Sequence, residues 1–181
     1  MSKPIGWGKC FIIAKDVTKT GSKWFLLPTP KEDTTKLSTS KGDKKEATIE
    51  GGENEDMKYL KNKYTLEYTI RRNSDRNKPF SDDDGVVADH YAIFVQPENK
   101  SVPGPYFAES VVSLEDSFDT SDGGMLAYSH DALRTDNATK ALQWATIDQD
   151  LSKLKEGEEL ATDPKFTIID AAAADATQQG S

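Results

Sequence analysis

The run Lys63 to Arg72 (KYTLEYTIRR) constrains the fold of this chain more than any other segment. Apolar side chains recur in it at every second position, as Tyr64, Leu66, Tyr68 and Ile70. Polar or charged side chains fill the positions between them, as Thr65, Glu67, Thr69 and Arg71. A period of two is typical of a half-buried β-strand. The run therefore predicts a strand with one apolar and one polar face.

The segment before this run is charged and contains glycine. Lys41 to Glu55 reads KGDKKEATIEGGENE. Between residues 34 and 56 the only apolar anchors are Leu37, Ala47 and Ile49, so burial in the monomer core is not expected to hold the segment. We predict that residues 34–56 form a projecting loop that becomes ordered by packing on a neighbouring subunit. The candidate contact residues are Lys41, Lys44, Lys45, Glu46, Glu50, Glu53 and Glu55.

Turn residues divide most of the remaining chain into short strand-like runs. These runs cover residues 9–17, 24–28, 36–39, 46–50, 64–72, 89–96, 106–118, 125–133, 140–147 and 166–169. Asp122-Gly123-Gly124 predicts a hairpin turn. Residues 53–60 are interpreted as one or two helical turns. Seven to nine short strands predict a mainly β fold, an antiparallel sandwich or barrel with a long projecting loop and extended termini.

The predicted organisation is one domain with an extension at each end. Residues 1–8 form an N-terminal arm, residues 9–147 the β-sandwich domain, and residues 148–181 a C-terminal extension. Within the extension, residues 150–160 are weakly amphipathic, and residues 171–181 have the small, polar composition of a terminal tail. A chain of 181 residues is long enough to bury a substantial core.

Charge is distributed unevenly along the sequence, whose net charge is −8. Residues 1–50 carry ten lysines and six acidic residues, whereas residues 101–181 carry five basic and fifteen acidic residues. We expect the basic part of one subunit to meet the acidic part of its neighbour, in a heterologous contact that generates rings or stacks. An acidic total also argues against a protein that grips nucleic acid, since that affinity comes from lysine and arginine on phosphates.

The sequence predicts a soluble protein made in a reducing cytoplasm. No stretch of 18 apolar residues is present, and the N-terminal residues lack the apolar region of a secretory signal, so no membrane insertion is expected. The single cysteine, Cys10, lies in an apolar run and is interpreted as a buried, inert thiol.

Catalytic patterns are weak, and we predict that the protein is not an enzyme and takes no metal or cofactor. The two histidines, His90 and His130, lie in strand-like runs and are interpreted as structural. Ser129 precedes His130 without the surroundings of a catalytic serine. Asp82-Asp83-Asp84-Gly85 lacks the alternating ligand spacing of a calcium loop and predicts a solvated turn. Trp7, Trp24 and Trp144 are interpreted as core or interface anchors.

The order of these segments resembles the tail tube proteins of bacterial viruses. The resemblance covers residues 9–147 and lies in the layout: an apolar first strand, a long charged arm (EATIEGGENE), KYTLEYTIR, the Asp-Gly-Gly hairpin followed by MLAYSHDAL, and a closing strand with a tryptophan. It implies a β-sandwich or barrel with a short flanking helix. It also implies six copies in a ring whose inner strands form a continuous barrel, with rings stacked into a hollow tube for DNA ejection. The long loop and the termini would join one ring to the next. The C-terminal extension departs from the family pattern.

This resemblance predicts a subunit of the virion tail, whose partners are copies of itself, other tail proteins and double-stranded DNA that passes without adhering. A lumen that releases DNA needs acidic or neutral polar side chains. The candidates are Glu67 and Thr69 on one strand, or Glu109, Ser113 and Glu115 on another. A capsid decoration protein, or less readily a small-ligand-binding barrel, remains an alternative function. The first would form trimers or single copies, and the second needs convergent polar groups inside the barrel.

Overall fold

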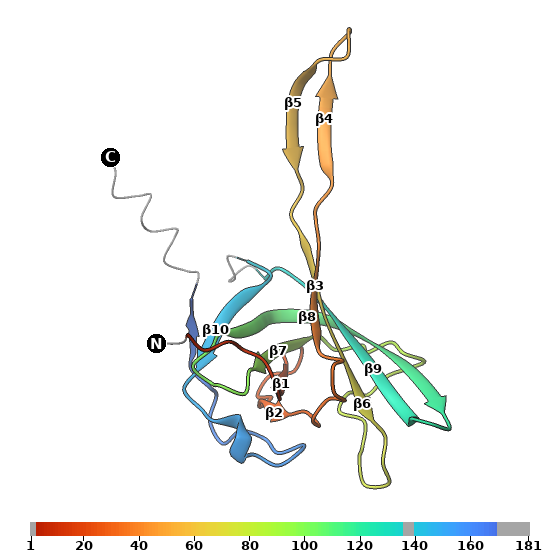
Figure 1. Ribbon diagram of the computed structural model, residues 1–181, viewed down its shortest axis with the longest axis vertical. Helices are drawn as coiled ribbons and strands as arrows, with labels where there is room; N and C mark the ends of the chain where they lie inside the picture. Colours follow the sequence, from red (N-terminus) through yellow and green to blue (C-terminus); the bar gives the residue numbers. More distant parts are fainter. Residues whose placement is uncertain (1–2, 136–139, 170–181) are drawn as a thin grey trace.

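The computed structural model describes residues 3–135 and 140–169, and its architecture is mainly β (Figure 1). Its strands are β1 (Phe11–Asp16), β2 (Phe25–Leu26), β3 (Lys36–Ser40), β4 (Lys44–Thr48), β5 (Asn54–Tyr59), β6 (Lys63–Arg71), β7 (Tyr91–Gln96), β8 (Gly104–Asp119), β9 (Gly123–Ala132), β10 (Gln143–Ile147) and β11 (Phe166–Ile168). The predicted strands are thus confirmed to within a few residues. The tail predicted at residues 171–181 lies outside the described residues.

Nine of the strands form one antiparallel sheet in the order β2-β1-β7-β8-β9-β6-β3, with β10 and β11 attached beside β8. The sheet curves around a core without closing into a barrel, so the mainly β sandwich or barrel prediction is confirmed in its broad form. The flanking helix is a single 3₁₀ turn, η1 (Leu151–Lys153), within the described residues. No helix of the described chain has the length and apolarity needed to span a membrane.

The main core lies inside the curve of the sheet. Leu66, Tyr68 and Ile70 of β6 are buried there, which confirms the alternation expected from the sequence. Phe80, from the long connection between β6 and β7, fills the centre and stacks edge-on against Tyr91 and Tyr128. Burying aromatic side chains of this size accounts for much of the apolar area removed from water.

A second core lies on the opposite face of β1 and β7, which explains why all six residues of β7 are buried. Trp24 packs there against Phe166, with ring centroids 5.4 Å apart. Leu151 and Leu160, from the region after β10, are 0% and 2% exposed. Residues 148–169 are therefore an integral cover of the sheet, and β11 extends it by pairing with β10.

The loop predicted to project, residues 34–56, does so only in part. Lys36–Ser40 belongs to the main sheet as β3, because it pairs with β6, whereas the chain after it projects as a β-hairpin (Figure 1). Strands β4 and β5 pair only with each other, from Lys44 opposite Tyr59 to Thr48 opposite Asn54. The helical interpretation of residues 53–60 is wrong, because Asn54–Tyr59 is a strand. The pairing across Gly51 and Gly52, both at positive φ, supplies hydrogen bonds to residues whose own sequence has no strong strand preference. We call residues 41–62 the arm.

Candidate assembly surfaces

Four strands form a ribbon that carries most of the predicted lumen residues. The ribbon comprises β3, β6, β9 and the distal half of β8, residues 110–119. Its concave face is apolar and belongs to the main core. Its other face consists of the intervening side chains, and we call it the polar face.

The structure brings four of the five lumen candidates together on the polar face. Glu67 and Ser113 lie on either side of Ser129, because both pair with that residue of β9. Thr69 and Glu115 flank Ala127 in the same way. These residues line a shallow hollow of about 330 Å³. The strand register thus places residues of both alternative candidate sets on one face, and their orientation toward a lumen stays a prediction.

Glu109, the fifth candidate, lies apart from the others. A register shift between β7 and β8 near this residue interrupts the regular pairing. The Glu109 carboxylate contacts Nδ1 of His90 at 2.7 Å, and both side chains are partly exposed. The structure thus places Glu109 in a local pair with His90 outside the hollow. His90 itself precedes β7, which begins at Tyr91.

Sequence reasoning missed the contribution of β9 to the polar face. Ser129 and Asp131 lie in its centre, and the Thr65 hydroxyl donates to the Asp131 carboxylate at 2.7 Å. The signal was present, because Ala127, Ser129 and Asp131 alternate with the buried Leu126, Tyr128 and His130. Basic residues occupy the margins of the face. Lys36 lies on the edge strand opposite Glu67, and Arg71, at one end, forms an ion pair with Asp122.

The ribbon has an open strand edge on each side. Within the described residues, β3 pairs with β6 alone, so its other edge is open. The end of β8, from Glu115 to Asp119, likewise pairs only with β9 in the part of the chain that the structure describes. Open edges present unpaired N–H and C=O groups that favour pairing with another strand. The ribbon can therefore be extended on both sides.

The arm continues the ribbon through a narrow neck. Leu60 donates its backbone N–H to the Asp43 carbonyl at 2.8 Å, and Gly42 donates its own to the Asn62 side chain at 3.1 Å. A Cβ on Gly42 would lie 1.9 Å from the Leu60 carbonyl oxygen. Only glycine permits this approach of the two chains, so Gly42 fixes the base of the arm.

All seven predicted contact residues lie on the arm, and all are exposed. Lys44 and Glu46 form an ion pair with each other. Lys41 lies over the ring of Tyr59, with Nζ 4.7 Å from the ring centre. Met57 and Tyr59 are apolar side chains that remain 51% and 58% exposed. An exposed two-stranded hairpin of this length is only marginally stable alone, which makes a surface contact with another chain its expected means of support.

A buried hydrogen-bond network in the main core joins Ser110, His130 and Tyr68. Ser110 donates to the Tyr91 carbonyl at 2.7 Å, so its oxygen is free to accept from Nδ1–H of His130 at 3.2 Å. Nε2 of His130 then accepts the Tyr68 hydroxyl at 2.8 Å. Burial lowers the pKa of His130 to about 3. The structural interpretation of His130 is confirmed, because its side chain and Ser110 are fully buried and no substrate can reach them.

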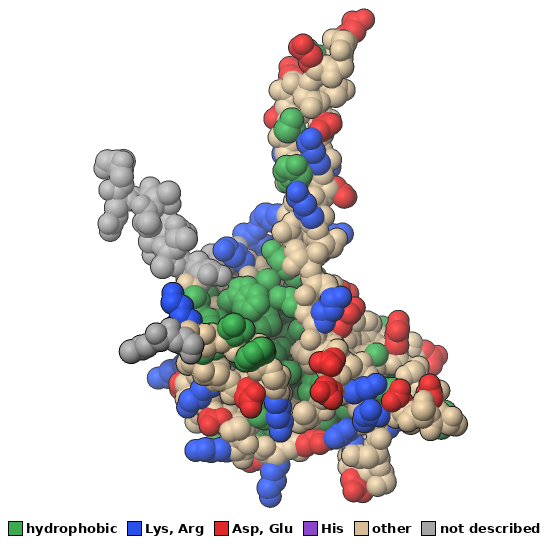
Figure 2. All heavy atoms as spheres, viewed as in Figure 1, with side chains coloured by type: hydrophobic (Ala, Val, Ile, Leu, Met, Phe, Trp, Pro, Cys, Tyr) green, Lys and Arg blue, Asp and Glu red, His purple; other side chains and the backbone are tan. Residues whose placement is uncertain are grey.

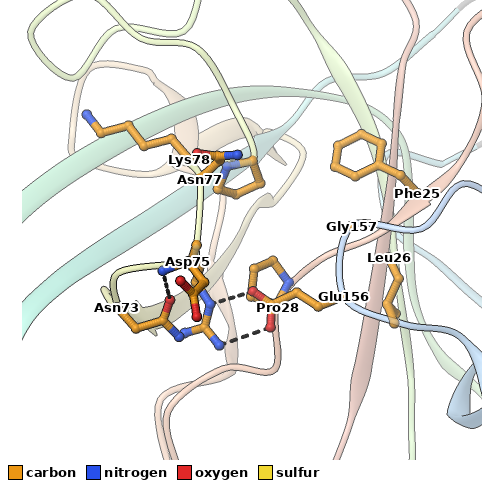
Figure 3. A pocket seen from close by; sticks show the side chains of 11 residues that line it. Phe25, Leu26, Pro28, Asn73, Asp75, Asn77, Lys78, Glu156 and Gly157 are labelled. Carbon is orange, nitrogen blue, oxygen red and sulfur yellow. Dashed lines mark hydrogen bonds and ion pairs between the residues drawn. The ribbon is translucent and has the colours of Figure 1, made fainter.

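A cleft of about 450 Å³ lies between the connection after β6 and the C-terminal segment (Figure 3). Both oxygens of Glu156 accept from Arg76, which also donates to the Arg71 carbonyl. Pro28 and Phe25 line the same cleft (Figure 3). The Arg76 guanidinium thus makes three hydrogen bonds, two to Glu156 and one to Arg71. We therefore interpret the Arg76–Glu156 ion pair as a link that holds the C-terminal segment, residues 148–169, in place.

The remaining predicted features are placed as follows. Trp24 is a core residue, whereas Trp7 and Trp144 are 78% and 37% exposed. Cys10 is only partly buried, and burial raises the pKa of its thiol. Residues 82–85 form a turn in which Asp82 accepts from the Gly85 backbone and contacts Lys78. The described residues contain no group of three or more side chains suited to hold a metal ion.

Comparison of the chain with protein-family models and with curated proteins gave no match.

Proposed function

We propose that this protein is a tail tube subunit of a bacterial virus, a structural protein whose copies assemble into stacked rings around a conduit for DNA. The observation that carries the proposal is the ribbon β3–β6–β9–β8. It combines an apolar concave face, a polar outer face and an open edge on each side. Edge-to-edge pairing of successive copies extends such a ribbon into a closed wall, which removes the exposed edges.

The polar face supports the proposal through its charge. Glu67, Glu115 and Asp131 lie in its central rows, whereas Lys36 and Arg71 lie at its margins. Adhesion to duplex DNA depends on lysine and arginine contacts with phosphates. A wall whose centre is acidic or neutral therefore lets DNA pass without holding it. The partners in this proposal are further copies of the chain and other tail proteins, in the virion tail.

Electron microscopy of the purified protein tests this function. Rings or hollow tubes are the expected result, and a ring six copies in circumference is the form that the family resemblance implies. Trimers or single copies would instead favour a capsid decoration protein. The small-ligand alternative finds little support in the fold, since Phe80, Tyr68 and Tyr128 fill the space inside the curved sheet.

Removal of the arm gives a sharper version of the same test. Ser40 and Lys63 form the last pair of the β3–β6 ladder, so residues 41–62 can be replaced by an Asn-Gly turn without altering the ribbon. We call the described chain outside the arm the body. We expect this variant to keep the thermal stability of the body and to lose the stacking of rings. Tubes of normal length from the shortened chain would show that the arm is not a stacking contact.

A further inference from the structure

Charge is separated along the arm. Residues 46–56 contain five acidic side chains and no lysine or arginine, and we call them the acidic tip. Residues 41–45 and 58–62 contain five lysines and one aspartate, and we call these lysines the lysine collar. Figure 2 shows acidic side chains gathered at the far end of the arm and lysines closer to the body. The arm is therefore strongly dipolar.

Most of these charges have no partner of opposite sign within the described residues. Lys44 and Glu46 form the one ion pair within the arm, and no ion pair joins the arm to the body of the described structure. Lys45 and Lys58 even lie directly opposite each other across the hairpin. Like charges in directly opposed positions destabilise a strand pair. Each half of the arm thus presents charge that is not neutralised inside the subunit.

A second copy of the chain carries the complement of both halves. We propose that the acidic tip of one subunit docks against the lysine collar of a neighbouring subunit, in a repeating head-to-tail contact. This inference rests on the proposed function, because it assigns the surface through which stacked subunits meet. Heterologous contacts of this kind propagate along a stack, since every copy offers one tip and one collar.

Length and surface chemistry fit such a contact. The eleven residues from Lys41 to Gly51 reach about 36 Å in an extended strand, and the nine residues of β6 span about 30 Å. Since the arm continues the line of β3 and β6, its tip lies farther from the main sheet than any other described part of the arm (Figure 1). Met57 lies next to the tip and Tyr59 lies among the collar lysines, on the same side of the hairpin as Glu46 and Lys44. A neighbouring arm would cover these exposed apolar side chains.

Charge reversal provides the experiment. The tip-reversed variant carries Glu50→Lys, Glu53→Lys and Glu55→Lys, and the collar-reversed variant carries Lys45→Glu, Lys58→Glu and Lys61→Glu. A control reverses three exposed lysines of the body, Lys23, Lys153 and Lys155, to glutamate. Circular dichroism checks that each variant is folded, which is expected because every altered side chain is exposed. Sedimentation velocity measures assembly, and electron microscopy identifies its form.

Each reversed variant loses three exposed ion pairs per arm contact, worth a few tenths of a kcal/mol each. For each arm contact, we therefore expect the protein concentration needed for assembly to rise about tenfold. The control should assemble as the wild type does. The chain that carries both reversals should recover assembly. An equimolar mixture of the tip-reversed and collar-reversed variants should recover it too. That recovery separates specific docking from a general effect of net charge.

The outcomes distinguish this inference from the proposed function. Tubes that form normally in the tip-reversed variant would overturn the docking contact and leave the tube assignment standing. Wild-type oligomers that are not tubes, but obey the reversal and rescue pattern, would sustain the docking contact and overturn the tube assignment. A wild-type chain that stays monomeric at every concentration would overturn both.

Discussion

The buried histidine should make the protein sensitive to mild acid. His130 has no contact with solvent, and both of its ring nitrogens are engaged as a neutral imidazole. Protonation would place a second donor against the Tyr68 hydroxyl and a charge inside the core. The pKa of His130 is lowered from its ordinary value of 6.5 to about 3, and desolvation by burial is the cause. Lowering the pH from 7 to 5 is therefore the informative perturbation.

The direction in which stability changes with pH follows from proton binding. Between pH 3 and 6.5 the unfolded chain binds a proton at this histidine and the folded chain does not, so the free energy of unfolding rises with pH in that window. Stability from this site is present above pH 6.5 and is lost as the pH falls. Between pH 7 and pH 5 the loss amounts to about 2 kcal/mol, from 1.36 kcal/mol per unit of pKa difference.

Urea denaturation of the wild type and His130→Gln at several pH values measures this loss. The glutamine variant is expected to be less stable at pH 7 because it disturbs the network, but its stability should fall by about 2 kcal/mol less between pH 7 and pH 5. His90→Gln, which alters the partly exposed histidine, should retain the wild-type loss. Equal pH dependence in the wild type and His130→Gln would refute the reasoning.

Three further variants test other parts of the structure. Tyr128→Phe removes a buried hydroxyl that has no hydrogen-bond partner among the described residues, so thermal denaturation should show unchanged or higher stability. Tyr68→Phe removes the partner of His130, and the same measurement should show a loss of about 1–3 kcal/mol. Gly42→Ala places a Cβ 1.9 Å from the Leu60 carbonyl oxygen. Hydrogen exchange should then show faster exchange in the arm and unchanged protection of the body, and equal protection of the arm would contradict the close approach.

Period-two patterns allowed the body of the fold to be predicted from the sequence. The side chains of β6 and β9 alternate between a buried and an outer face, and that local property depends little on the rest of the chain. The predicted helix at residues 53–60 failed for the opposite reason. Asn54–Tyr59 has only two apolar side chains, Met57 and Tyr59, and its strand conformation comes from pairing with β4 across the Gly51-Gly52 turn.

Long-range contacts also explain what the sequence left unassigned. The C-terminal segment looked like an extension because Leu151 and Leu160 stand among charged residues. Their burial depends on the second face of β1 and β7, which a local pattern does not show. The sharing of one polar face by Glu67 and Ser113 likewise depends on the register of both strands with β9. Glu109 lies four residues before Ser113 in β8 and contacts His90 instead.

The charge of the polar face leads to a prediction about function itself. Glu115 lies near the open edge of the ribbon with Ala127 opposite it, so Glu115→Lys changes the charge of the face without breaking an ion pair in the described structure. In the proposed tube this substitution repeats around every ring. Each added lysine offers a phosphate contact, and such contacts slow the transit of DNA in a salt-dependent manner. Virions assembled with the variant should eject DNA more slowly, most clearly at low salt.

The matched control is Glu159→Lys, which makes the same charge change at an exposed residue of the C-terminal segment, away from the ribbon. In the proposed assembly Glu159 lies outside the lumen, so this variant should eject DNA at the wild-type rate. Both variants must first form tubes of normal length, as judged by electron microscopy. If Glu115→Lys tubes then eject DNA as fast as the wild type at every salt concentration, the polar face does not line the path of the DNA. The arm and its contacts would still account for stacking, because they involve a different surface of the chain.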